Sequence, residues 1–191
     1  MAHLTKFKHD QIKTAEFFEQ FSRVSETTTP KDPIDMFMAA AQKPETITNI
    51  AQVNKNIWDH YRILLKHCQP LRMRGDITTA CSWRFNLPEN VKDTNSKNYY
   101  FVLAFAFCKM LYGGDNYENI LGCWIHDCEK PYMQFLFCPI VKDPKTGRKQ
   151  IRCTAVIDRQ HLRTFHPEFN DFLEANGFNV KEGRLKNVTQ N

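Results

Sequence analysis

Two strongly apolar segments joined by a short polar connection constrain the fold of this chain more than any other feature. They are 119–126 (NILGCWIH) and 132–142 (YMQFLFCPIVK), with residues 127–131 between them. Short apolar runs bounded by turn residues are typical of strands, and strands joined so closely pair antiparallel. The pattern predicts a β hairpin, and alternation places Met133, Phe135 and Phe137 on one apolar face that helices must cover.

The rest of the chain alternates between helical and extended patterns. Apolar spacing predicts helices over 10–22, 34–42, 46–66 and 99–112, and a last helix from Asp158 to Ala175. Thr48 is a candidate N-cap of the third helix, and Asn95 or Ser96 of the fourth. Segments 1–8, 73–86 and 149–157 fit strands, 25–33 fits a loop, and 143–147 (DPKTG) fits a turn.

This order lacks the regular rhythm of β-α-β units. It predicts an α+β fold with a mainly antiparallel sheet flanked by helices. We expect a single domain over residues 1–177, followed by a polar C-terminal extension over 178–191.

Net charge and cysteine content limit the partners and the cellular compartment expected for the protein. The net charge of +5 permits a nucleic-acid partner without requiring one. The seven cysteines form no Cys-x-x-Cys pair, and several, such as Cys108 and Cys138, lie inside apolar runs. This usage predicts reduced thiols in a cytoplasmic protein, and no apolar run is long enough to cross a bilayer, so no membrane partner is expected.

The connection between the two hairpin strands and the residues beside it contain the side chains best suited to bind a ligand or a metal. His126 lies at the end of the first strand, Glu129 in the turn, and Tyr132 and Gln134 share the polar face of the second strand. These four polar side chains are predicted to converge. A His/Glu pair offers two ligands for a divalent metal, but such pairs also form simple hydrogen bonds.

The same segment resembles the MobV/Pre plasmid mobilisation and recombination family. That family carries His-x-Asp-Glu-x-x-Pro-His-x-His before an apolar strand ending in Val-Pro. Here His126 to Gln134 precedes a strand that runs into Cys138-Pro139. The resemblance extends to Ala2-His3-Leu4-Thr5-Lys6 at the N-terminus, to Leu111–Asn116 before the hairpin and to Val156–His166 after it, and so covers nearly the whole chain.

Membership would imply the histidine-hydrophobe-histidine (HUH) relaxase fold, in which a divalent metal lies beside a nucleophile that attacks a DNA phosphodiester. This chain departs from the pattern at the reactive positions. Gln20 stands where the family has its nucleophilic histidine in His-x-x-Arg, with Arg23 retained, and Tyr132 and Gln134 replace the paired histidines. An amide is not a nucleophile at neutral pH, and an amide and a phenol are poor ligands for a transition metal. The remaining candidates, His126 and Glu129, would hold at most a weakly bound Mn or Mg ion.

A basic stretch after the hairpin provides candidate DNA contacts, because lysine and arginine side chains can follow phosphates. Its alternative interpretation is an ordinary solvated surface. The candidate DNA-binding residues are Arg23, Arg74, Lys142, Lys145, Arg148, Lys149, Arg152 and Arg159.

Three functions follow from these features. The first is a DNA-binding relaxase-like protein of a plasmid or other mobile element, which binds single-stranded or hairpin DNA without the family's nicking activity. The second is an active, metal-dependent nickase or rolling-circle initiator that uses another nucleophile, such as Tyr132. The third is a relaxase-like scaffold that binds protein partners of the mobile element.

Overall fold

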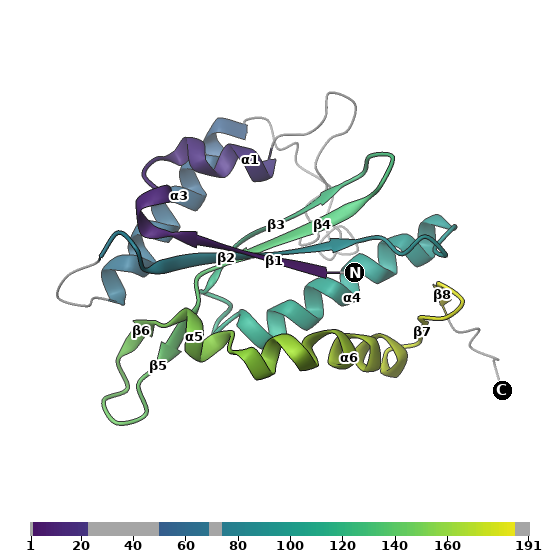
Figure 1. Ribbon diagram of the computed structural model, residues 1–191. Helices are drawn as coiled ribbons and strands as arrows, with labels where there is room; N and C mark the ends of the chain where they lie inside the picture. Colours follow the sequence, from purple (N-terminus) through teal and green to yellow (C-terminus); the bar gives the residue numbers. More distant parts are fainter. Residues whose placement is uncertain (1, 23–49, 69–73, 186–191) are drawn as a thin grey trace.

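A four-stranded antiparallel sheet forms the centre of the computed structural model, which describes residues 2–22, 50–68 and 74–185. Its strand order is β1-β2-β4-β3, with β1 at Ala2–Lys8, β2 at Thr78–Asn86, β3 at Ile120–His126 and β4 at Tyr132–Phe137. Strands β3 and β4 form the predicted hairpin, and β2 pairs with both β4 and β1 (Figure 1). The predicted α+β class with a mainly antiparallel sheet is confirmed.

Helices cover both faces of this sheet. Helices α4 (Thr94–Tyr112) and α6 (Arg159–Ala175) lie on one side, and α1 (Glu19–Ser22) and α3 (Ile50–His67) lie on the other (Figure 1). Because side chains alternate along a strand, each strand supplies both layers of the core. Trp83, Phe85 and Phe135 pack towards α4 and α6, whereas Trp124 and Leu136 pack with aromatic residues of the other layer.

The segment predicted as one helix over 10–22 is divided into three pieces. Two 3-10 turns, η1 (His9–Gln11) and η2 (Ala15–Phe18), precede α1, and the backbone at Thr14 is extended. The apolar spacing still has a structural basis, since Ile12, Phe18 and Phe21 are all buried in the same core layer. These buried side chains, rather than a continuous run of helical hydrogen bonds, hold the segment against the sheet.

Two other predicted boundaries are wrong. Strand β2 begins at Thr78 rather than at residue 73, because residues 74–77 form a turn closed by a hydrogen bond from Ile77 N to Arg74 O. Helix α4 begins at Thr94 rather than at Tyr99, because Asp93 caps it by accepting a 2.8 Å hydrogen bond from Ser96 N. The carboxylate of Asp93 therefore takes the role expected of Asn95 or Ser96.

The long strand predicted over 132–142 is interrupted. Strand β4 ends at Phe137, and β5 (Ile140–Lys142) leaves the sheet to pair with β6 (Lys149–Ile151). Pro139 lacks the N–H group that a continuing ladder requires. The predicted turn joins β5 to β6, and Asp143 accepts hydrogen bonds from Lys145 N and Thr146 N. The expected strand over 149–157 then gives way to a short helix, α5 (Cys153–Val156).

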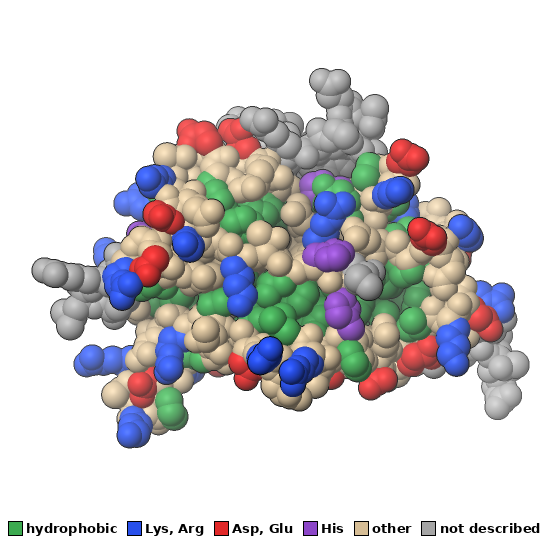
Figure 2. All heavy atoms as spheres, in the orientation of Figure 1, with side chains coloured by type: hydrophobic (Ala, Val, Ile, Leu, Met, Phe, Trp, Pro, Cys, Tyr) green, Lys and Arg blue, Asp and Glu red, His purple; other side chains and the backbone are tan. Residues whose placement is uncertain are grey.

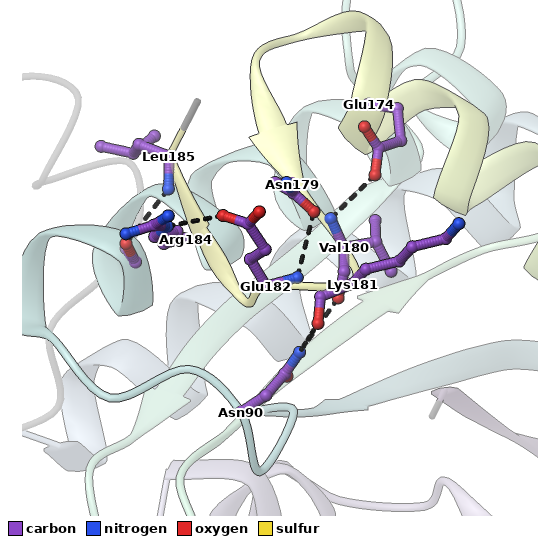
Figure 3. Close-up of polar contacts among 9 residues, drawn as sticks. Asn90, Glu174, Asn179, Val180, Lys181, Glu182, Arg184 and Leu185 are labelled. Atoms are coloured by element: carbon purple, nitrogen blue, oxygen red, sulfur yellow. Dashed lines mark hydrogen bonds and ion pairs between the residues drawn. The ribbon is translucent and has the colours of Figure 1, made fainter. Parts of the chain in front are cut away.

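The C-terminal part of the described chain packs back onto the domain. Helix α6 is capped by Asp158 as predicted, and a small hairpin of β7 (Phe178–Asn179) and β8 (Arg184–Leu185) follows it. Phe178 is buried in the core, and Asn90 Nδ2 donates 3.0 Å hydrogen bonds to the carbonyls of Val180 and Lys181 (Figure 3). The segment expected as a polar extension therefore begins with a packed hairpin, while the domain division itself stays a prediction.

Some predictions lie outside the described residues, namely the loop over 25–33, the helix over 34–42 and the Thr48 cap. Within the described ranges, no helix combines the length and the apolar character needed to span a lipid bilayer.

Candidate functional site

Polar side chains from three strands meet on the sheet face that α1 and α3 cover only in part. Residues directly opposite each other in an antiparallel pair project to the same side. In the register, Tyr132 on β4 lies between Asn86 on β2 and His126 on β3. Gln134, two residues along β4, is flanked by Arg84 and Trp124. The sheet thus brings together side chains that are more than thirty residues apart in sequence.

The centre of this face is a stack of three side chains, Arg84, Tyr132 and His126. The guanidinium carbon of Arg84 lies 3.7 Å from the centroid of the Tyr132 ring. The imidazole of His126 is stacked on the same ring, with centroids 4.3 Å apart and planes inclined by 17°. Because β2 and β3 lie on opposite sides of β4, the two partners approach the Tyr132 ring from opposite sides. We call these three residues the Tyr132 stack.

Arg84 supplies the positive charge of the stack. Its side chain is exposed, and its Nε donates a 3.0 Å hydrogen bond to the side-chain oxygen of Asn86. That bond and the ring contact hold the guanidinium over the Tyr132 ring. Arg84 forms no ion pair with a carboxylate among the described residues, so its charge remains available to an anionic ligand.

His126 is partly buried and favours the neutral form. Burial lowers the pKa of its imidazole, and the nearby positive charge of Arg84 lowers it further, whereas a hydrogen bond with Gln134 raises it. Its Nε2 is buried and has no hydrogen-bond partner among the described residues. Buried polar atoms normally have a hydrogen-bond partner, so the unpaired Nε2 of His126 is a position where a ligand could donate or accept a hydrogen bond if the site opened.

Glu129 lies in the hairpin turn, outside the strand pairs that carry the stack. It is exposed and lines a cleft of about 590 Å³ at the end of the sheet. Of the predicted quartet, the structure therefore brings His126, Tyr132 and Gln134 together and places Glu129 at the neighbouring cleft. The other residues that line this cleft include Arg84, Asn86, Lys92, Lys130 and Pro131.

The residues present do not fit a firmly held divalent metal. One imidazole, one amide and one phenol surround the site, and the described ranges contain no group of three or more His, Cys, Asp or Glu side chains placed for a metal ion. Manganese and magnesium favour carboxylate, water and imidazole ligands in larger sets than this. We therefore assign no chemical step to a metal.

Gln20, the residue at the position of the missing nucleophile, lies on α1 next to this face. Phe21 stacks on Trp124 with ring centroids 5.7 Å apart, which places α1 beside the row that contains Gln134. The Gln20 side chain is exposed, and its Nε2 donates a 2.8 Å hydrogen bond to the carbonyl of Phe17. Arg23, predicted to accompany it, lies outside the described residues.

The predicted DNA-binding cations are dispersed rather than gathered at the stack. Three of them form ion pairs: Lys142 with Asp115, Lys149 with Glu118, and Arg74 with Asp76. The β5–β6 hairpin lies at the opposite end of the sheet from the β3–β4 turn (Figure 1), and Figure 2 shows lysine and arginine side chains spread over much of the visible face. Among the described residues, ion pairs are absent at Lys145, Arg148, Arg152 and Arg159.

Arg84 is not among the candidate site residues that the sequence predicted. A detectable signal was present, because Arg84 is the one charged residue in the otherwise apolar and neutral run 77–86. A charged side chain inside a sheet strand whose neighbours are buried projects to an open part of the sheet face.

Comparison with known proteins supports the architecture. No protein-family model and no curated protein matches the chain. Solved structures of the MobM relaxase domain (MOBV; Mob_Pre) do match. The complex with 22 nucleotides of plasmid pMV158 oriT DNA, Mn-bound at pH 4.6, has a TM-score of 0.64 at 18% identity and covers 100% of this chain and 94% of that chain.

Two further MobM structures agree with this result. A Mn-bound complex with 3'-thiophosphate DNA has a TM-score of 0.64 at 20% identity and covers 100% of this chain and 93% of that chain. A complex with 26 nucleotides of oriT DNA has a TM-score of 0.61 at 17% identity, with 100% and 94% covered. At these identities the likeness concerns the fold, and the chain has the α+β, HUH-type fold of the MobM relaxase domains.

Proposed function

We propose that this protein is a DNA-binding, relaxase-like protein of a plasmid or other mobile element, and that it binds single-stranded or hairpin DNA without the nicking chemistry of a relaxase. The observation that carries the proposal is the Tyr132 stack. It includes Tyr132, one of the two residues that the resemblance places at the paired histidines, and it sets a cation, Arg84, over that ring.

The chemistry of the stack suits an unpaired strand. A guanidinium can pair with a phosphate oxygen, and the face of the Arg84 guanidinium that is turned away from the Tyr132 ring can stack on an unpaired base. In duplex DNA the bases are already stacked, so we expect weaker duplex binding.

The arrangement argues against Tyr132 as a nucleophile activated by His126. A general base must lie in line with the hydroxyl proton that it removes. The two rings instead lie almost parallel, at 17°, and the imidazole Nε2 has no hydrogen-bond partner among the described residues. Deprotonation of Tyr132 by this histidine would require the rings to rearrange.

Fluorescence anisotropy tests the binding function. The probes are labelled oligo-dT, a hairpin with a single-stranded 3' tail and a blunt duplex, each at several salt concentrations. We expect tighter binding to the first two probes and a roughly 5- to 150-fold loss of affinity for Tyr132→Ala, since the ring supports the Arg84 guanidinium on which a base stacks and such stacking contributes about 1–3 kcal/mol per base. Tyr132→Phe should retain most of the affinity, and Arg84→Ala should lose affinity and salt dependence.

The matched control is Arg163→Ala, which removes an exposed arginine from α6 on the opposite side of the sheet. It should bind like the wild type. A supercoiled-plasmid assay with Mn or Mg tests the nickase alternative, because nicking abolished by Tyr132→Phe would establish an active enzyme. If none of the probes binds at low salt, the protein-binding scaffold is the better description.

A further inference from the structure

Two cysteines that are distant in sequence face each other beside a lysine. Cys81 lies in the middle of β2 and is fully buried, whereas Cys153 begins α5 and is partly exposed. Their sulfur atoms are 3.7 Å apart, at van der Waals contact. A disulfide has a sulfur–sulfur distance of about 2.05 Å, so a modest movement of one side chain would allow the bond to form.

Lys6 completes this group. It is the direct cross-strand partner of Cys81 on β1, so its side chain projects to the same side of the sheet. The hydrogen bond from Cys81 lowers the pKa of the Cys153 thiol, partial burial raises it, and the positive charge of Lys6 lowers it again. The same hydrogen bond and burial raise the pKa of Cys81. The partly exposed thiol of Cys153 is therefore the one favoured as a thiolate, and the buried thiol of Cys81 keeps its proton.

We propose that Cys153 is an oxidant-reactive thiol and that Cys81 is its resolving partner, so that a peroxide converts the pair into a Cys81–Cys153 disulfide. This modification site is separate from the Tyr132 stack, since Cys81 projects from the sheet face opposite Arg84 and Tyr132.

The reaction takes two steps. The Cys153 thiolate attacks one oxygen of hydrogen peroxide, so that an S–O bond forms, the O–O bond breaks, and the released hydroxide takes a proton to become water. The Cys81 sulfur then attacks the sulfenic acid on Cys153, so that an S–S bond forms and the S–O bond breaks. The departing hydroxide takes the Cys81 proton. The two thiols lose two electrons, and the peroxide is reduced to two molecules of water.

The disulfide would join two distant parts of the fold. Cys153 directly follows the β5–β6 hairpin, and Cys81 lies in the central strand pair. The bond would close a loop across 72 sequence positions and tie α5 to β2. Because a cross-link reduces the entropy of the unfolded chain, we expect the melting temperature to rise by roughly 5–10 °C on oxidation and to fall again when a reductant is added.

The test treats the full chain with stoichiometric hydrogen peroxide, blocks the remaining thiols by alkylation and identifies cross-linked peptides by mass spectrometry without reduction. We expect a Cys81–Cys153 peptide and a loss of two of the seven titratable thiols. In Cys81→Ser, Cys153 should remain as a sulfenic acid that dimedone labels. In Cys153→Ser, the cross-link should be absent and Cys81 should stay reduced.

Cys128 provides the matched control, because it is the exposed cysteine of the described chain and its thiol donates a 3.3 Å hydrogen bond to the carbonyl of Lys130. Cys128→Ser should form the disulfide as the wild type does. The proposal is overturned if Cys153 in the folded protein reacts with peroxide no faster than Cys128. It is also overturned if Cys81→Ser, shown to be folded by circular dichroism, gives no dimedone adduct at Cys153.

Discussion

The hydroxyl group of Tyr112 connects three elements of the core. It accepts a 2.9 Å hydrogen bond from the indole N–H of Trp83 on β2 and lies 2.6 Å from Nε2 of His161 on α6. Since the indole can only donate, the hydroxyl proton is free to be donated to His161. The Tyr112 ring also stacks on Phe137 at 4.3 Å. A single residue thus aligns α4 and α6 on the sheet.

We therefore expect Tyr112→Phe to lower the free energy of unfolding by about 1–3 kcal/mol, because it leaves the buried Trp83 N–H without a partner. Urea denaturation measures the change. The matched control is Tyr117→Phe, since the Tyr117 side chain is 53% exposed and should tolerate the substitution. Equal stabilities for the two variants would contradict the role assigned to this network.

His126 predicts a pH dependence of stability. Burial lowers the pKa of this imidazole in the folded protein below the ordinary value of 6.5. The unfolded chain therefore binds a proton more readily, and stability that is fully present above the unfolded pKa is lost as the pH falls towards the folded pKa. We expect the free energy of unfolding to decrease from pH 7.5 to pH 5 less steeply in His126→Gln than in the wild type. His67→Gln, at an exposed histidine, should follow the wild-type curve.

At the scale of elements, a capping side chain sets where a helix begins. The predicted helix and strand that are interrupted are broken by the packing of buried side chains in one case and by a proline in the other. Asp158 begins α6 by accepting a 2.7 Å hydrogen bond from His161 N, as its position before an amphipathic segment predicts. The breaks within 10–22 and after Phe137 have other causes. The first depends on anchoring by Ile12 and Phe18, and the second on Pro139, which follows the central strand β4.

The cap of α6 is directly testable. Asp158→Ala should lower the free energy of unfolding by about 1 kcal/mol, because an N–H group at the start of the helix loses its acceptor. Asp171→Ala, at an exposed position in the same helix, serves as the control and should change stability much less. Asp158→Asn should retain most of the cap, since an amide oxygen also accepts this hydrogen bond. Denaturant midpoints at neutral pH compare the variants.

At the scale of the whole molecule, exposed positive charge is present both at Arg84 of the Tyr132 stack and on the distant β5–β6 hairpin. If DNA follows both regions, each phosphate contact should contribute separately to the salt dependence of binding. We expect a double substitution, Lys145→Gln with Arg148→Gln, to reduce the slope of log K against log salt by about one to two. Lys181→Gln, on the C-terminal hairpin, is the control. An unchanged slope would show that the β5–β6 hairpin is not part of the DNA-binding surface.

By itself, the sequence determined the elements whose cause is local. Period-two alternation predicted the β3–β4 hairpin and its apolar face, and helical spacing with a capping aspartate predicted α6. These patterns can be recognised in the sequence because each depends on residues within a few positions of one another. The resemblance at the hairpin also anticipated the HUH-type fold.

Tertiary structure alone decided which distant side chains meet. Strand β2 inserts between β1 and β4, and this register brings Arg84 onto Tyr132 and places Lys6 opposite Cys81. The return of the chain after β6 then sets Cys153 against Cys81. Strand order and long-range register depend on the packing of the complete core, which no local pattern encodes. For that reason His126, Tyr132 and Gln134 were predictable as a group, whereas Arg84 as their partner and the cysteine pair were not.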